Sequence, residues 1–324
     1  MRTVMVTGVG AIIGYGVLRA LRPLRKEIRL VGTDIYADAV GQAWADTFVQ
    51  APLTANPAYP EWLARTLREQ CVDLVIPAIE QDVHFFSDHR DLFVQAGVGI
   101  ALNAAALIDL TRDKWAMDEA LVSMNSPVRI PTRLDGDFRT LVDAFGLPFL
   151  LKPRRSYASK GMVRVRSEAD FVPHRDQLGT VLMAQPIVGS DAEEYTVAVF
   201  GDGSGRVCAS IILRRQLAQD GSTAKAWVCH DASLDAVVAA LCQTFKPIGP
   251  TNLQFRKTDD GWKLLEINPR VSSTTSLRTA FGYNEARMCV DYFLDDRAIT
   301  QPAIRHGFAA RYIEDFVVHD RDHF

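Results

Sequence analysis

The sequence has few cysteines, no long apolar run and little net charge, and each of these absences excludes a class of protein. Its five cysteines are scattered without a Cys-x-x-Cys pair, so neither a disulfide framework nor a zinc site is expected. No run approaches the ~20 apolar residues that cross a membrane, and no basic region with an apolar core opens the chain. The formal net charge of -3 gives no electrostatic reason to bind nucleic acid. We therefore expect a cytoplasmic protein with neither a membrane nor a nucleic-acid partner.

The length and composition are those of a folded protein with several lobes. A chain of 324 residues exceeds one ordinary compact core and suits two or three units of ~100 to 200 residues. Hydrophobic residues make up 48% and charged residues 23%, which is typical of globular proteins and names no function.

Short apolar runs alternate with helix-like segments over the first hundred residues. The runs cover residues 4–7, 28–32 and 74–77, and helical patterns cover residues 12–21 and 62–70. Strands that alternate with helices predict a parallel sheet with crossover helices.

Four glycines follow the first of these strands, and Asp34 closes the second. The spacing Gly8-x-Gly10-x-x-x-Gly14 is one residue longer than the dinucleotide fingerprint, whose tight turn depends on its spacing. A nicotinamide-dependent dehydrogenase is therefore kept only as an alternative. We favour the interpretation that these glycines allow close packing of strand and helix.

Two further regions follow a helical linker at residues 101–132. Residues 149–153 and 162–165 have strand patterns, and a polar loop lies between them. A β-rich region begins near residue 181, with a hairpin turn at residues 201–205 and a helix at residues 233–245.

The last two strand patterns predict a hairpin that carries oxygen-bearing side chains on one face. Residues 252–256 and 262–268 flank Asp259-Asp260-Gly261, and Gly261 suits the left-handed position of a three-residue loop. With that loop, Gln254 lies opposite Glu266 and Asn252 opposite Asn268. Period two then places Leu253, Phe255, Leu265 and Ile267 on the buried face.

One carboxylate with several amide oxygens is a partial cage for a hard cation. Mg²⁺ takes one or two carboxylates and completes its coordination with water and substrate phosphates. Arg270 follows the second strand and adds a permanent positive charge suited to a transferring phosphoryl group. Without Arg270, an exposed polar face would explain the hairpin equally well.

The segment Glu266-Ile267-Asn268-Pro269-Arg270-Val271-Ser272, preceded by the Gln254 strand, resembles the metal and phosphate motif of ATP-grasp enzymes. It is most similar to one module of the carbamoyl-phosphate synthetase large subunit. The resemblance implies an α/β and α+β fold in three parts. Residues 1–105 would form a Rossmann-like pre-ATP-grasp domain, residues 106–185 a small lobe with a flexible loop, and residues 186–324 a large lobe with the metal and phosphate site.

The resemblance also implies roles for individual residues. Lys114 and Lys152 would contact the nucleotide phosphates, and the loop at residues 156–161 would cover them, although Gly161 is its only glycine. Glu194 would hold the ribose hydroxyls. The predicted nucleotide-binding residues are Lys114, Lys152, Ser159, Gly161, Gln185, Pro186, Ile187, Val188 and Glu194. The predicted metal ligands are Gln254, Glu266 and Asn268, and Mg²⁺ or Mn²⁺ would serve.

Substrate contacts are less closely defined by the sequence. Arg270, Lys152 and Arg214 are the predicted catalytic residues. Arg215 and Arg278 are further arginines whose planar forks suit a carboxylate. Glu80 and Asp82 follow a predicted parallel strand and either reach an amine or cap the next helix.

The implied chemistry is transfer of the ATP γ-phosphate to a small carboxylate and attack of an amine on the resulting acyl phosphate. A carboxylate-amine ligase with small-molecule substrates is therefore our first expectation, and a homodimer is compatible with it. Two alternatives stay open, the dehydrogenase and an ATP-binding regulatory module without catalysis. The chain has length for one module, so carbamoyl phosphate synthesis itself is not expected.

Overall fold

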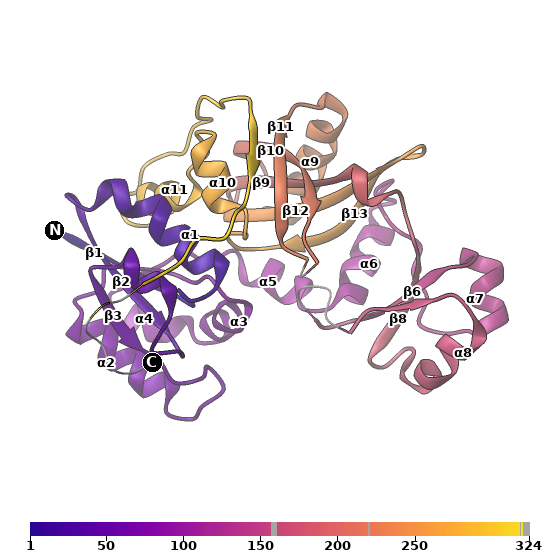
Figure 1. The fold of residues 1–324 in the computed structure, drawn as a ribbon, viewed down its shortest axis with the longest axis horizontal. Helices are drawn as coiled ribbons and strands as arrows, with labels where there is room; N and C mark the ends of the chain where they lie inside the picture. Colours follow the sequence, from indigo (N-terminus) through magenta and orange to yellow (C-terminus); the bar gives the residue numbers. More distant parts are fainter. Residues whose placement is uncertain (157–160, 220, 318, 320–324) are drawn as a thin grey trace.

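Three β-sheets follow one another along the chain, and helices pack against each of them (Figure 1). The computed structural model describes residues 1–156, 161–219, 221–317 and 319. The first sheet has five strands, the second three and the third six. This α/β and α+β organisation confirms the predicted fold class. Within the described part of the chain, no helix is long and apolar enough to cross a membrane.

All strands of the first sheet are parallel, in the order β3-β2-β1-β4-β5. The strands are β1 (Arg2–Thr7), β2 (Ile28–Asp34), β3 (Thr47–Gln50), β4 (Leu74–Ile76) and β5 (Gly99–Ile100). The helices are α1 (Ile12–Leu21), α2 (Tyr59–Glu69), α3 (Glu80–Asp88) and α4 (Arg90–Ala96). Val4, Met5 and Val6 are fully buried, because helices cover both faces of a parallel sheet.

The glycines after β1 allow α1 to approach its neighbours. A Cβ on Gly14 would lie 2.2 Å from the carbonyl oxygen of Gly8, and one on Gly16 would lie 2.9 Å from Thr275. The backbone N–H of Gly10 donates to Asp34 Oδ2 at 2.7 Å. These contacts support the packing interpretation of the glycines.

The second sheet is small and antiparallel, with the order β7-β6-β8. Its strands are β6 (Phe149–Pro153), β7 (Val163–Val165) and β8 (Leu182–Pro186). Helices α7 (Phe138–Phe145) and α8 (Glu168–Phe171) lie against it (Figure 1). Leu141, Phe149, Phe171 and Leu182 form a separate core there.

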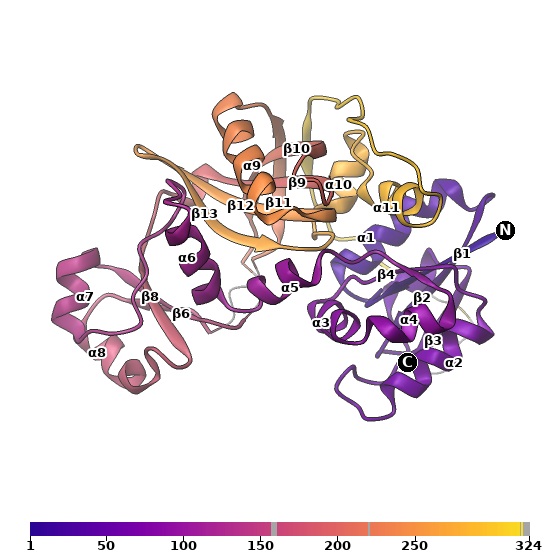
Figure 2. The same cartoon turned by 180° about the vertical axis from the view of Figure 1, so that it is seen from behind.

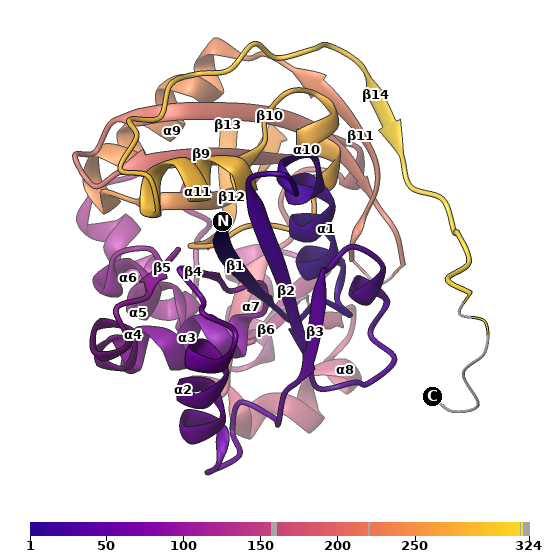
Figure 3. The ribbon, with the colours of Figure 1, turned by 90° about the vertical axis from the view of Figure 1, so that its left-hand side faces the viewer.

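The third sheet is antiparallel and has the order β13-β12-β9-β10-β11-β14. Its strands are β9 (Glu194–Asp202), β10 (Val207–Leu217), β11 (Thr223–Cys229), β12 (Ile248–Thr258), β13 (Gly261–Asn268) and β14 (Phe308–Ala310). β14 lies at the edge beside β11 (Figure 3). The helices are α9 (Ala232–Phe245), α10 (Thr275–Ala280) and α11 (Glu285–Phe293). Short 3₁₀ helices cover Arg22–Leu24, Val40–Ala43, Val172–Gln177 and Asp191–Glu193.

The two faces of the third sheet have different neighbours. One face packs on α9 and on Met117 and Leu121 of α6 (Lys114–Ser123). On the other face, Ala198, Phe200 and Ile211 share a core with α1 and α11. Further along the same strands this second face becomes polar, beginning with Thr196. The polar continuation of this sheet face is therefore where a site can form.

The connection between the first two sheets runs through α5 (Ala105–Thr111) and α6 (Figure 2). The strands of the first sheet lie within residues 1–105, but α6 contributes to the core of the third sheet. Helices α10 and α11 in turn pack against α1. The three parts therefore pack against one another. Their limits at residues 105 and 185 stay a proposal.

Candidate active site

The β12–β13 hairpin brings together the oxygen-bearing side chains that the sequence singled out. Gln254 pairs with Glu266, and Asn252 pairs with Asn268, as predicted. All four side chains line one cleft of about 560 Å³. The polar face of the hairpin is therefore turned toward a cavity.

The turn of this hairpin is shorter than predicted. Thr258 pairs with Gly261 rather than with Trp262, so only Asp259 and Asp260 lie between the strands. The predicted pairing of Gln254 with Glu266 still occurs because a β-bulge between Gln254 and Phe255 inserts one extra residue into β13. The shorter turn and the bulge each shift the pairing by one residue in opposite directions, so the two shifts cancel.

The bulge corrects the prediction for one side chain. Phe255 pairs with Leu264, which is buried in the core of the sheet. Leu265 is the extra residue, and it lines the cleft together with Glu266 instead of the core. A bulge shifts the alternation of faces by one residue, and this is why Leu265 does not share the face of Leu253.

The cleft is lined by side chains from three parts of the chain. Glu80 comes from α3, Lys152 from β6, Gln254 and Glu266 from the β12–β13 hairpin, and Arg270 from the segment after β13. Within the described residues, five cationic side chains line it, namely Lys114, Lys152, Arg215, Arg256 and Arg270. A cavity with so many cations fits a polyanion.

Glu266 is the carboxylate at the centre of the predicted metal site. Its Oε2 accepts a hydrogen bond from Asn268 Nδ2 at 3.1 Å. The amide oxygen of Gln254 accepts from Arg215 at 2.7 Å, and that of Asn268 accepts from Arg270 at 3.3 Å. Among residues 1–156, 161–219, 221–317 and 319, no three His, Cys, Asp or Glu side chains are grouped to hold a metal. Glu266 with two amide oxygens nevertheless fits Mg²⁺ when phosphate oxygens complete the shell.

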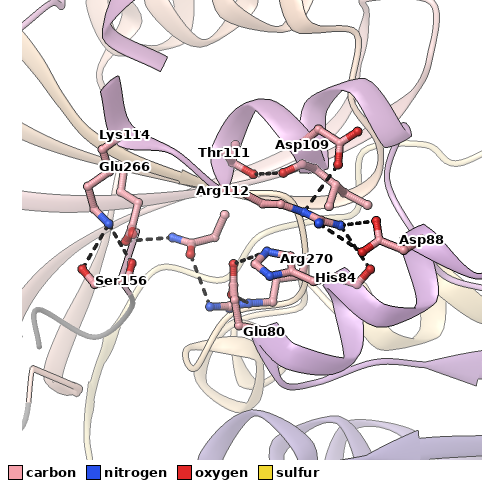
Figure 4. A network of polar contacts seen from close by, with 12 residues as sticks. Glu80, His84, Asp88, Asp109, Thr111, Arg112, Lys114, Ser156, Glu266 and Arg270 are labelled. Carbon is pink, nitrogen blue, oxygen red and sulfur yellow. Dashed lines mark hydrogen bonds and ion pairs between the residues drawn. The ribbon is translucent and has the colours of Figure 1, made fainter. Parts of the chain in front are cut away.

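Arg270 connects the hairpin to the first sheet. Its Nε donates to Glu80 Oε2 at 2.6 Å, and the Arg270 side chain is only 13% exposed. Figure 4 shows this pair beside His84, with Lys114, Ser156 and Glu266 nearby. Burial alone would raise the pKa of Glu80, but the Arg270 guanidinium outweighs burial and the pKa lies below its usual value. Glu80 therefore stays a carboxylate that orients Arg270.

Lys152 lies deep in the cleft. Burial and the nearby Lys114 ammonium lower its pKa to about 8, while Glu266 opposes the shift. Lys114 Nζ donates to the backbone oxygen of Ser156 at 2.6 Å. Both ammonium groups face the place where anionic phosphates would balance them.

Arg214 is not among the residues that line the cleft, so this geometry does not favour its predicted catalytic role. Its guanidinium donates to the backbone oxygen of Ala192 at 2.8 Å and to Glu193 at 2.7 Å, and the side chain is 43% exposed. The next residue, Arg215, points into the cleft and is 6% exposed. Successive residues of a strand point to opposite faces, so only Arg215 of these two candidates lines the cleft.

Glu194 is buried at the base of the cleft between two guanidinium groups. Its Oε1 accepts from Arg215 at 2.8 Å, and its Oε2 accepts from Arg256 at 2.9 and 3.1 Å. Both carboxylate oxygens are thus engaged. Oε1 retains a lone pair that could accept from a ribose hydroxyl, whereas Oε2 already accepts twice from Arg256, and binding of ribose by Glu194 stays a prediction.

The end of β8 and the two residues after it, which the sequence analysis assigns to a nucleotide hinge, border the cleft. Pro186, Ile187 and Val188 line the cleft, whereas the Gln185 side chain turns away and donates to Thr132 Oγ1 at 2.8 Å. Gly161 is exposed with a φ of +75°. It does not belong to the cleft lining, although Ser156 and Met162 do.

Ser159 lies outside the described residues. Arg256 and Met162 are among the cleft residues to which the sequence analysis gave no role. Strand alternation from Gln254 would have indicated Arg256, which shares its face.

Two further predictions concern buried arginine and carboxylate side chains. Arg278 is fully buried and donates to Glu285, to Thr196 and, at 2.5 Å, to Asn252 Oδ1. It therefore holds Thr196 and Asn252 in place and does not itself line the cleft. Asp82 lies outside the cleft and accepts from Thr54 and Tyr59.

Comparison with known proteins agrees with this geometry. Residues 181–316 match the family described as ATP-grasp in the biosynthetic pathway with Ter operon. The carbamoyl phosphate synthase large chain of Methanosarcina barkeri is 22% identical over 218 residues. That match covers 61% of this chain but only 20% of the relative, so the chain spans about a fifth of its length.

Solved structures show the same fold over nearly the whole chain. N5-carboxyaminoimidazole synthetase from Staphylococcus aureus, with ADP, superposes with a TM-score of 0.72 at 17% identity, covering 94% of this chain and 80% of that one. The biotin carboxylase domain of the 2-oxoglutarate carboxylase from Hydrogenobacter thermophilus superposes with a TM-score of 0.67 at 16% identity, covering 95% and 73%. Residues 181–316 are thus similar to an ATP-grasp family, and the solved structures share the fold of most of the chain.

Proposed function

We propose that this chain is an ATP-dependent carboxylate-amine ligase that works through an acyl phosphate. The observation that carries the proposal is the cleft itself, where Glu266 and two amide oxygens share one cavity with two lysines and three arginines. A nucleotide triphosphate with a divalent cation is the ligand that needs both sets of groups.

Each group has a role in this proposal. Pro186, Ile187 and Val188 border the adenine, Glu194 faces the ribose, and Lys114 and Lys152 bind phosphate oxygens. Mg²⁺, held by Gln254, Glu266 and Asn268, would neutralise charge on the phosphates. Arg270, held in place by Glu80, stabilises charge on the transferred phosphoryl group.

The reaction needs no covalent intermediate on the protein. A carboxylate oxygen of the acid bonds to the γ-phosphorus of ATP, and the bond from that phosphorus to the bridging oxygen breaks to release ADP. The amine nitrogen then bonds to the acyl carbon, phosphate leaves, and the nitrogen loses a proton. Positioning and exclusion of water are what the cleft contributes to both steps.

The similar proteins support this proposal through their names. One solved structure is a synthetase bound to ADP, and the H. thermophilus domain contains MgADP and bicarbonate. Bicarbonate therefore belongs among the acids to be tested, beside amino acids and other small carboxylic acids. All five cysteines are free thiols, which supports a reducing compartment such as the cytoplasm.

The test is ADP release from ATP and Mg²⁺ over a matrix of small acids and amines. In a parallel set, hydroxylamine replaces the amine, so that an acyl phosphate is trapped as a hydroxamate that iron(III) reveals. We expect one acid to give both ADP and hydroxamate. ADP release without hydroxamate for every acid would refute the acyl phosphate.

The alternatives give different results. A dehydrogenase would change the absorbance of NAD(P)H at 340 nm, and a regulatory module would bind ATP without releasing ADP. The amide N–H of Gly10 is already bonded to Asp34, which does not favour a dinucleotide at that turn.

A further inference from the structure

A second cavity of about 920 Å³ lies at the carboxyl ends of β1, β2 and β4. Its wall contains apolar and aromatic side chains, including Leu53, Tyr59 and Phe85. Tyr59 is almost completely buried, and its ring packs edge-on against Phe85 with centroids 5.0 Å apart. The cavity is thus large enough for a small organic molecule with an apolar body.

The charged groups of this cavity are all acidic. Its lining includes Asp34, Asp38, Asp82 and Asp88, and contains no lysine, arginine or histidine among the described residues. Asp88 is balanced by Arg112 at 2.6 Å. The other three carboxylates form no ion pair within the part of the chain that the structure describes.

Asp34 and Asp82 are buried despite this lack of a cation. Asp34 accepts hydrogen bonds from the backbone N–H groups of Gly10 and Tyr36, at 2.7 and 3.0 Å. Asp82 is 3% exposed and accepts from the hydroxyls of Thr54 and Tyr59, at 2.6 and 3.1 Å. Burial raises the pKa of Asp82; hydroxyl donors oppose this, and the nearby Asp34 adds to it. Buried carboxylates without a counter-ion are costly, and a cationic ligand would remove that cost.

The second cavity borders the ATP cleft. Ala11, Ile79 and Gln81 line both. Glu80, between Ile79 and Gln81, faces the cleft and holds Arg270, while Asp82 on the same helix faces the second cavity. A molecule in the second cavity can therefore extend past the first turn of α3 toward the reacting phosphate.

We infer that the second cavity binds the acceptor, and that this acceptor is an amine with an apolar body and an additional cationic nitrogen that lies against Asp34 and Asp82. The inference rests on the proposed function. The attacking nitrogen must be a neutral amine, so it lies in the cation-lined cleft near Glu80 and Gln81 rather than among the aspartates. The nitrogen among the carboxylates stays protonated and anchors the molecule. An anionic ligand such as a dinucleotide is disfavoured because no cation lines this cavity in the described chain.

Binding is tested on the full chain without ATP, with phenethylamine and its uncharged analogue 2-phenylethanol as probes. Isothermal titration of both gives their dissociation constants. We expect phenethylamine to bind at least about tenfold more tightly, because a charged hydrogen bond to a buried carboxylate favours the cation. Equal binding of the two probes, or tighter binding of NAD⁺ than of phenethylamine, would overturn the inference.

Substitutions of the buried aspartates test whether the probe binds in the second cavity. Asp82→Asn and Asp34→Asn each keep the size of the side chain, and each is expected to remove most of the preference for the amine. Glu61→Gln removes an exposed carboxylate from α2 and is expected to change nothing. Two in-cavity variants are used so that one can report if the other fails to fold, as judged by thermal unfolding. An unchanged preference in a folded Asn variant contradicts the proposed site.

The inference and the proposed function fail in distinguishable ways. Titration without ATP reports on the cavity alone, and ADP release reports on the cleft. For an acid that gives ADP, diamines with an apolar spacer are compared with monoamines of the same length. Asp82→Asn is expected to raise KM for the diamine at least about tenfold with little change in kcat. Equal KM values for diamines and monoamines in the wild type would show that the second cavity does not bind the acceptor during the reaction.

Discussion

The two cavities of this protein share a border but have opposite charge. The cleft on the third sheet is lined by five cationic side chains, whereas the cavity at the end of the first sheet has four aspartates and no cation within the described chain. The net charge of -3 conceals this separation. Placement of charge, rather than its sum, defines what each cavity can bind.

The largest effect is expected where the cation-lined cleft loses its one hairpin carboxylate. Glu266→Ala removes that metal ligand and should lower ADP formation by roughly 10³-fold or more. The measurement is ADP release at saturating Mg²⁺ and ATP. Glu193→Ala, which removes a carboxylate outside the cleft lining, is the matched control and should stay near wild type. Turnover close to normal in Glu266→Ala would contradict the metal assignment.

Removal of one buried cation should reduce activity and increase stability together. Lys152→Met is expected to lower kcat/KM for ATP by roughly 10²- to 10³-fold, since a phosphate contact is lost. The same variant should unfold at a higher temperature, because the ammonium is held where burial penalises its charge. Lower thermal stability would show that Lys152 packs as a structural side chain.

The depressed pKa of Lys152 also predicts a pH dependence. In the folded protein this pKa is about 8, below the usual 10.5. Between these values the unfolded chain binds more protons, so this group makes stability rise with pH across about pH 8 to 10.5. The kcat/KM for ATP should fall as pH rises through about 8, as the ammonium is lost from the free enzyme. Lys152→Met should lack the stability slope over that window.

Two neighbouring arginines sharpen the comparison between cleft and surface. Arg215→Ala leaves Glu194 with one fewer guanidinium and should reduce ADP formation by roughly 10²-fold. Arg214→Ala should change it by less than about threefold, because an exposed ion pair contributes little. The measurements are kcat and KM of both alanine variants. Arg215→Lys, which keeps the positive charge, is the conservative comparison. Equal effects of the two alanine variants would show that strand alternation does not separate them functionally.

Among substitutions of cleft side chains, the smallest effect is expected at the border between the cavities. Glu80→Gln removes the charge that orients Arg270, and should lower kcat by roughly tenfold while KM for ATP changes little. Wild-type kcat in this variant would mean that Arg270 is held well enough by Asn268 and the backbone oxygen of Val271.

Local sequence patterns predicted the elements on which the site is built. Alternating strands and helices gave the parallel first sheet, and period two placed Gln254 and Glu266 on one face of a hairpin. These predictions succeed because pairing across a short turn depends on residues close in sequence. The predicted loop was nevertheless one residue too long, and the bulge at Leu265 compensated for the error.

Other features depend on contacts between distant parts of the chain. Whether Arg214 or Arg215 faces the cleft follows from the pairing of β10 with β9, where Arg215 lies opposite Glu194. The contact between Glu80 and Arg270 joins residues 190 positions apart. A sequence read along one strand contains no information about either.

The sequence by itself determined the oxygen-bearing hairpin, the glycine-rich turn and the order of the three sheets, because periodicity and turn chemistry act over a few residues. Tertiary structure alone decided which cations gather around Glu266, which carboxylates are buried without a partner, and that the two cavities meet at α3. Those outcomes depend on how whole sheets pack against one another, and packing sets burial, distance and therefore charge state.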